Sequence, residues 1–77
     1  MGYRRGMSEI RADMVANVME LYVSEGDQIN VGDTIVLLES MKMEIPVIAE
    51  TAGIVTRLAV AVGDVIQEGD LLVAIDE

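Results

Sequence analysis

One lysine stands out among the residues that could do chemistry. Lys42 is the only lysine in a chain of 77 residues, and it lies between Met41 and Met43 in a short segment that begins at Glu39. A unique primary amine gives an acylating enzyme a single side chain to find. The two methionines would offer flexible apolar contacts to a partner, because thioethers adapt to the surface that they meet. These residues indicate a site of covalent acylation at Lys42.

The same residues also allow plainer interpretations. A single lysine in an acidic chain is commonly a solvated charge, and methionines beside a strand are commonly part of the core. If Met41 and Lys42 are the central residues of a two-residue hairpin turn, the residues beyond them pair across the hairpin. Glu39 then faces Glu44, which is mildly unfavourable for two like charges. Such turns prefer Gly and Asn, so Met-Lys would be strained there, and a strained tip is often a functional site.

Other kinds of site lack their usual residues. The chain has no Cys and no His, so it offers no thiol and neither the usual general base nor the usual metal ligand. Nothing in the sequence assembles a catalytic pocket, so we expect a protein that is not an enzyme and holds no metal. The formal net charge of −9 argues against nucleic acid and anionic membranes as partners. That charge suits either simple solubility or attraction to basic docking sites on other proteins.

The chain repeats itself. Residues 18–39 lie over residues 55–76 without a gap, an offset of 55 − 18 = 37 positions. The pairs Gly-Asp at positions 26 and 32 match the pairs Gly-Asp at positions 63 and 69. Each half is too small to bury its own apolar face, so the halves must share one core, related by a pseudo-twofold axis. Lys42 falls at the junction between the two copies.

The elements that must position Lys42 are strands. Apolar runs rich in β-branched residues cover residues 18–23, 35–38, 55–62 and 71–75. The Gly-Asp pairs between them are turn signals, because Gly allows positive φ and the following Asp can bond its own backbone. No window has a capped apolar period of 3.6 residues, so no helix is expected. We predict an all-β fold with about eight short strands in two antiparallel layers.

The domain organisation is simple. We expect residues 1–6 to form a flexible extension, because they have no counterpart in the repeat, and residues 7–77 to form a single domain. Met7-Ser8 resembles a natural start, which favours a free-standing subunit over an excised domain. No apolar run approaches the roughly 20 residues of a membrane span, and no secretory signal follows the N-terminal arginines. The absence of cysteine suits the cytosol, so a cytoplasmic location is expected.

The motif and the repeat together resemble the biotinyl domain family (the biotin/lipoyl attachment domain). The segment Glu39-Ser40-Met41-Lys42-Met43 lies at the midpoint of a twofold duplication with paired Gly-Asp turns, and the resemblance covers nearly all of residues 7–77. It implies a flattened β-barrel, a sandwich of two four-stranded antiparallel sheets. It also implies that the hairpin with the lysine lies opposite the chain ends.

The resemblance implies a role for each residue of the motif. Lys42 would receive biotin in an amide bond from biotinyl-adenylate, delivered by a biotin protein ligase. Met41 and Met43 correspond to the flanking methionines of the motif, and Glu39 to the acidic position that the ligase senses. The protein would be a biotin carboxyl carrier that shuttles a carboxyl group from a biotin carboxylase to a carboxyltransferase site. The isolated carrier is expected to be a monomer and chemically inert.

Two alternatives remain open at this point. Lipoyl domains of dehydrogenase complexes share the fold and also modify a hairpin lysine. Their usual signature has Asp before the lysine and Ala after it, whereas Met stands at both places here, which favours biotin. The second alternative is an unmodified module of the same fold that serves only as a structural adaptor.

Overall fold

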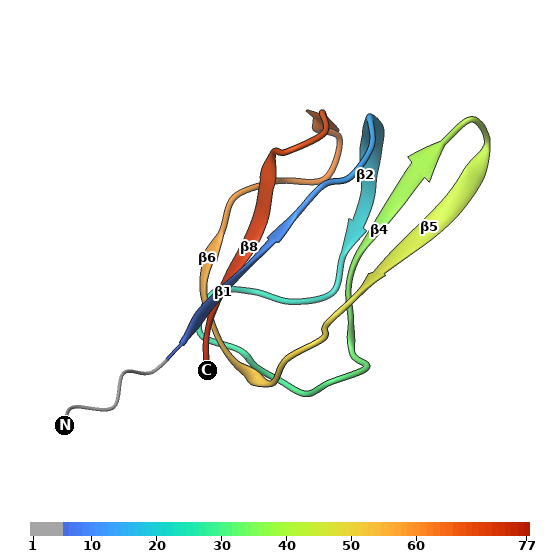
Figure 1. Cartoon of the computed structure of the whole chain (residues 1–77). Coiled ribbons are helices and arrows are strands. Elements are labelled where there is room, and N and C mark those ends of the chain that lie inside the picture. The colour runs from blue at the N-terminus through green and yellow to red at the C-terminus, as the bar shows by residue number, and fades with distance from the viewer. Residues whose placement is uncertain (1–5) are drawn as a thin grey trace, which may run out of the picture.

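The structure is a computed structural model that describes residues 6–77. Within this range every regular element is a strand (Figure 1). The eight strands are β1 (Met7–Arg11), β2 (Ala16–Leu21), β3 (Gln28–Ile29), β4 (Thr34–Ser40), β5 (Met43–Ile48), β6 (Gly53–Leu58), β7 (Val65–Ile66) and β8 (Leu71–Asp76). The predicted extension lies outside the described residues except for Gly6, so the division into residues 1–6 and 7–77 stays a prediction.

The strands form two sheets of four. One sheet has the order β1-β8-β6-β3 and the other the order β5-β4-β2-β7. Every pairing is antiparallel. This confirms the predicted all-β class and the two four-stranded antiparallel layers. The order leaves β1, β3, β5 and β7 as edge strands, while β2, β4, β6 and β8 are inner strands with a partner on each side.

The register of the strands repeats with the sequence. Val18 of β2 pairs with Leu38 of β4, and Val55 of β6 pairs with Ile75 of β8, which is the same pairing shifted by 37 positions. The irregularity that follows Val18 in the first pair also follows Val55 in the second. The predicted pseudo-twofold repeat is therefore confirmed at the level of single residue pairs.

The two halves share one aliphatic core. Ile35 and Val36 of β4 and Val73 and Ile75 of β8 are completely buried, and aliphatic residues from the other strands fill the rest of the space between the sheets. Full burial of each such side chain contributes about 1.5–3 kcal/mol. No polar side chain is buried among the residues that the structure describes. The inner strands β4 and β8 thus anchor both sheets.

The Gly-Asp pairs close turns as predicted. Gly63 has φ of +96°, a backbone conformation that side chains rarely adopt. The carboxylate of the following Asp64 accepts the N–H of Ala61 at 2.9 Å. The other three pairs repeat this arrangement at Gly26, Gly32 and Gly69. These turns fix where each strand ends.

Two predicted strands are too long. The run at residues 18–23 passes the end of β2 at Leu21. The apolar run at residues 55–62 suggested a single strand, but β6 ends at Leu58. The reason is the next turn, which begins at Ala61, because Asp64 bonds back to Ala61 through both its N–H and its carboxylate. Val60 lies outside the strand and still packs against the core. Val60 is therefore apolar because it packs against the core from a loop, and not because it belongs to a strand.

The hairpin formed by β4 and β5 projects at one end of the molecule. Figure 1 shows its tip at the end opposite the start of β1 and the end of β8. Because β4 is also paired with β2, the inner arm of the hairpin is held on both sides. This position opposite the first and last strand ends (Figure 1) agrees with the one that the resemblance implied, opposite the chain ends.

Candidate functional site

The predicted hairpin turn is present at the tip of β4 and β5. Ser40 pairs with Met43, which leaves Met41 and Lys42 as the two central residues. Their φ angles are 53° and 66°, and positive φ at both central residues is the pattern of a type I′ turn. Among the described residues they are the only residues other than glycine with positive φ. Each costs on the order of 1 kcal/mol in this conformation.

The side chains at the tip point into solvent. Met41 is 91% exposed and Met43 is 65% exposed, so neither methionine belongs to the core. Lys42 is exposed as well. Within residues 6–77 no side chain or backbone group forms a hydrogen bond or ion pair with the Lys42 ammonium. The tip thus presents a primary amine that bonds none of the described residues and that lies between two accessible thioethers.

Two carboxylates lie directly below the turn. Glu39 of β4 faces Glu44 of β5, as the two-residue turn requires. On the other side of β4, Asn17 faces Glu39, and Val65 of β7 faces Asn17. These four residues form one row across the outer face of the sheet, because residues opposite each other in antiparallel strands share a face. The turn therefore stands over a row that is acidic at one end and apolar at the other.

A third carboxylate adds to the negative charge of this face. The hydroxyl of Tyr22 donates to the Glu20 carboxylate at 2.7 Å. The pKa of Tyr22 is raised, first by this hydrogen bond and then by slight desolvation and the charges of Glu20 and Glu44. Sequence reasoning assigned a role to Glu39 and predicted Glu44 opposite it. Glu20 carried no motif signal, and the neighbouring positions of β5, β4 and β2 in the sheet bring Tyr22 within reach of the charges of both Glu20 and Glu44.

The arrangement suits chemistry carried out on Lys42 by another protein. No group of three His, Cys, Asp or Glu side chains that could hold a metal ion occurs in residues 6–77. In the same range no helix is long and apolar enough to cross a membrane. The predicted site residues Glu39, Met41, Lys42 and Met43 all lie on one hairpin. What the hairpin offers is an accessible amine on a fixed tip.

Comparison with known proteins gives a consistent picture. The family model described as "Biotin-requiring enzyme" matches residues 7–75. The chain is 64% identical over 67 residues to the "Biotinylated protein TB7.3 homolog" of Mycobacterium leprae (strain TN), covering 87% of this chain and 94% of that protein.

Larger proteins contain a similar region. The chain is 44% identical over 66 residues to the "Biotin-dependent acyl-coenzyme A carboxylase alpha3 subunit" of Mycobacterium leprae (strain TN), covering 86% of this chain and 11% of that subunit. Among solved structures, a single-chain, multi-domain long-chain acyl-CoA carboxylase matches with a TM-score of 0.87 and 30% identity. That match covers 100% of this chain and 8% of the carboxylase chain.

Proposed function

The chain belongs to the family of biotin-requiring enzymes, and on that premise we propose that it carries biotin on Lys42 as the carboxyl carrier of a biotin-dependent carboxylase. The observation that carries the proposal is the type I′ turn, which holds the one lysine of the chain exposed at the tip of β4 and β5. Relatives described as biotinylated support biotin as the group attached. They give no support to lipoate.

The attachment step needs little from this chain beyond the amine. The Lys42 ammonium loses a proton inside a biotin protein ligase, and Nζ attacks the activated carboxyl carbon of biotin. An amide bond forms, the bond from that carbon to the adenylate oxygen breaks, AMP leaves, and Nζ releases a second proton. Since no described residue bonds the ammonium, the ligase does not have to break a contact before it takes up the side chain.

The rest of the hairpin serves to hold Lys42 in place. When attached, biotin supplies a ureido nitrogen that takes up a carboxyl group at one site and gives it up at another. The chain contributes a long flexible lysine stem on a rigid base, since β4 below the turn is inserted between β5 and β2 and its residues Val36 and Leu38 are buried. Tethering of this kind raises the local concentration of the carried group at each site that it visits.

We propose three protein partners: a biotin protein ligase, a biotin carboxylase and a carboxyltransferase. The similar regions in an acyl-coenzyme A carboxylase subunit and in a multi-domain carboxylase support the last two. In this proposal the chain itself is a non-catalytic carrier, monomeric when isolated and located in the cytoplasm. Sedimentation of the purified chain tests the monomeric state.

Intact-mass spectrometry tests the attachment. The wild-type chain and a Lys42→Arg variant are each incubated with biotin, ATP and a biotin protein ligase, and in parallel with lipoate, ATP and a lipoate ligase. We expect one biotinyl group on the wild type, none on Lys42→Arg, and no lipoyl group on either. A lipoyl adduct without a biotinyl adduct would mean that the chain carries lipoate and not biotin. No adduct under either ligase would mean that the chain is an unmodified structural adaptor.

A second variant controls for the position of the lysine. Arg57 is exposed in β6, so the double variant Lys42→Arg, Arg57→Lys still has a single accessible lysine, away from the hairpin. We expect no biotin on it. Biotinylation of this double variant at the wild-type rate would mean that the hairpin is not what the ligase recognises.

The shuttle is tested with the biotinylated chain. Incubation with a biotin carboxylase, MgATP and labelled bicarbonate is expected to place label on the wild type and none on Lys42→Arg. A carboxyltransferase with its acceptor is then expected to remove the label. Retention of the label in the presence of both would contradict the shuttle.

A further inference from the structure

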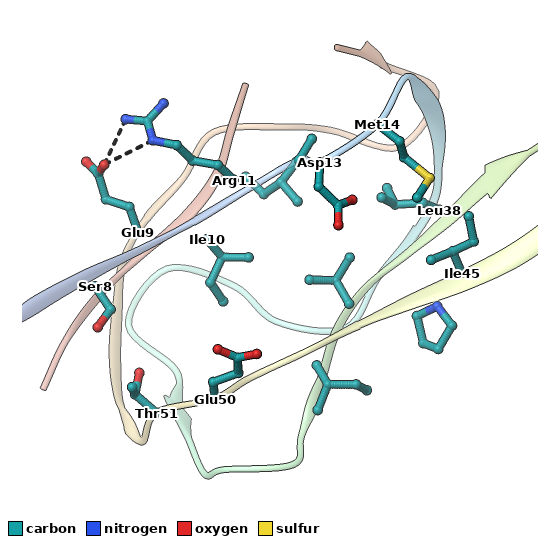
Figure 2. Close-up of a pocket in the computed structure, with 15 residues that line it drawn as sticks. Ser8, Glu9, Ile10, Arg11, Asp13, Met14, Leu38, Ile45, Glu50 and Thr51 are labelled. Atoms are coloured by element: carbon teal, nitrogen blue, oxygen red, sulfur yellow. Dashed lines mark hydrogen bonds and ion pairs between the residues drawn. The ribbon is translucent and has the colours of Figure 1, made fainter. Parts of the chain in front are cut away.

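A groove lies between the edge strands β1 and β5, away from the Lys42 turn. Its volume is about 570 Å³, and it runs along the seam where the edges of the two sheets face each other (Figure 2). Residues 8–14 line one side, and residues 45–48, 50 and 51 line the other. These two segments occupy matching places in the repeat, so the groove lies along the pseudo-twofold axis.

The floor of the groove is apolar. Ile10 and Met14 on one side and Ile45 and Val47 on the other are partly buried and pack against the core. Buried Leu38 and Leu72 also line it. A ligand that fills the groove would therefore bury apolar groups of its own against this floor.

The two strands that flank the groove have one free edge each. β1 is paired only with β8, and β5 only with β4. In β5 the middle of that free edge is blocked, because Pro46 has no N–H and a proline inside a strand turns its nitrogen to the unpaired side. Free backbone groups on an edge strand are a template for an added strand. Pro46 removes this possibility at the centre of β5.

The repeat shows that β1 lacks this protection. Pro46 faces Leu37, and at the matching place Glu9 faces Ala74, so Glu9 occupies the position of Pro46 in the same register. By that register the N–H and C=O of Glu9 point away from β8. Unlike Pro46, Glu9 keeps its N–H. The edge of β1 therefore has the donor that the edge of β5 has lost.

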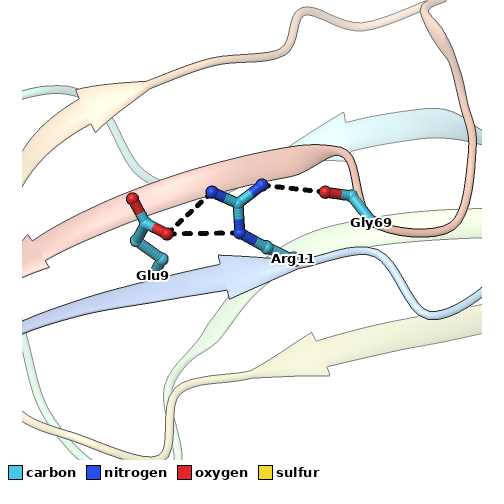
Figure 3. Close-up of polar contacts among 3 residues, drawn as sticks. All are labelled: Glu9, Arg11 and Gly69. Carbon is cyan, nitrogen blue, oxygen red and sulfur yellow. Dashed lines mark hydrogen bonds and ion pairs between the residues drawn. The ribbon is translucent and has the colours of Figure 1, made fainter.

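The charge at the groove is negative. Arg11 bonds the Glu9 carboxylate through Nη2 at 2.7 Å and through Nε at 3.2 Å, and its Nη1 donates to the carbonyl oxygen of Gly69 at 2.8 Å (Figure 3). The guanidinium is thus held beside Glu9 and the turn that precedes β8. Figure 2 shows the Asp13 and Glu50 carboxylates directed into the groove from its two sides. No described cation pairs with either carboxylate.

We propose that this groove binds an extended basic segment of a partner protein, which adds to the free edge of β1 as an extra strand. Alternate side chains of an added strand point to one face, so apolar residues at every second position would cover the floor. Lysine or arginine residues between them would lie near Asp13 and Glu50. A second copy of this chain fits poorly, because each copy carries a net charge of −9. The proposal does not depend on Lys42 or on biotin.

The test uses the isotope-labelled full chain and a capped peptide in which valine alternates with lysine. Nuclear magnetic resonance is expected to show shifts concentrated at residues 7–14 and 45–51, with slower hydrogen exchange at the Glu9 amide. A peptide in which glutamate replaces every lysine is expected to cause no shifts. No perturbation by millimolar lysine peptide, equal effects of both peptides, or shifts outside the groove would each overturn the proposal.

Two variants locate the contacts. Glu9→Pro removes the free donor of β1 and copies the residue that β5 tolerates at the matching position, and we expect binding about tenfold weaker. The double variant Asp13→Asn, Glu50→Gln should also weaken binding several-fold and flatten its salt dependence. This double variant tests the proposal even if the Glu9→Pro variant fails to fold.

A matched double variant controls for overall charge. Glu20→Gln with Glu68→Gln removes the same charge from exposed positions outside the groove. We expect it to bind the lysine peptide as the wild type does. Equal weakening by the two double variants would mean that the peptide responds to net charge alone, which would overturn the proposed site.

Discussion

Glu39 and Glu44 face each other across the β4–β5 hairpin, directly below the turn that carries Lys42. Two like charges at directly opposed positions of a sheet destabilise it. No described cation forms an ion pair with either carboxylate. The hairpin therefore keeps an unfavourable pair next to a strained turn, and both features concern the residues around the proposed attachment site.

Neutralising Glu39 or Glu44 distinguishes their effect on the stability of the fold from their effect on recognition by the ligase. We expect Glu39→Gln and Glu44→Gln each to raise the free energy of unfolding by about 0.2–1 kcal/mol, because each removes the repulsion. If Glu39 is the carboxylate that the ligase senses, Glu39→Gln alone should lower kcat/KM for biotinylation by about tenfold, the loss of one charge-assisted hydrogen bond. Urea unfolding and initial biotinylation rates measure the two effects. Equal rates for the two variants would contradict a special role of Glu39.

The positive φ angles of the turn predict a stabilising substitution. Asn tolerates the conformation of Met41 better than Met does, so Met41→Asn should stabilise the fold by up to about 1 kcal/mol, or several degrees in Tm for a domain of this size. Met43→Asn is the matched control, because Met43 is also exposed but has no positive φ. Thermal unfolding followed by circular dichroism compares the two. A Tm of Met41→Asn no higher than that of Met43→Asn would mean that the turn is not strained.

Much of this hairpin follows from local sequence. The duplication places Lys42 between two copies of one unit, and apolar strands on both sides of it allow only a short connection. The opposition of Glu39 and Glu44 then follows from a two-residue turn. The strand order could not be obtained in this way. It depends on which strands meet in space, and only that order places Tyr22 near the Glu44 charge and makes β1 the neighbour of β5 across the groove.

Apolar residues with different places in the structure could not be told apart from the sequence. Val60 packs against the core from a loop, and its apolar character lengthened the predicted strand beyond Leu58. Met41 and Met43 could have been core residues by composition, yet they are exposed because the turn carries them past the end of the sheet. Periodicity alone does not distinguish these cases, because a residue's burial depends on contacts distant in the sequence.

Gly53 should resist substitution. A Cβ at this position would lie against the backbone carbonyl of Asp76 and 2.8 Å from Cγ2 of Ile75. We expect Gly53→Ala to cost about 1–3 kcal/mol, because backbone cannot yield as a flexible side chain does. Ala16 holds the matching place in the other half, so Ala16→Gly is the control and should cost only about 0.5–1 kcal/mol. A Gly53→Ala chain as stable as the wild type in urea would contradict the close approach of β6 and β8.

The hydrogen bond from Tyr22 to Glu20 predicts how this tyrosine titrates. The pKa of Tyr22 is raised chiefly because its hydroxyl donates to the Glu20 carboxylate, so Glu20→Gln should lower it toward the ordinary value. Phenolate absorbance in a Tyr3→Phe background measures Tyr22 alone. Because the folded pKa is the higher one, the associated stability is present below about pH 10 and is lost as pH rises through the folded pKa. An unchanged titration in Glu20→Gln would show that the hydrogen bond is absent in solution.

Protection from trypsin tests the attachment of biotin to Lys42 most directly. Lys42 is the only Lys or Arg between Arg11 and Arg57, so trypsin cuts the unmodified chain there into residues 12–42 and 43–57. An amide on Nζ removes the charge that trypsin recognises. After treatment with biotin protein ligase, we predict a single uncut peptide of residues 12–57 that carries one biotinyl group. A biotinylated protein whose digest still contains unmodified peptides 12–42 and 43–57 would contradict the account.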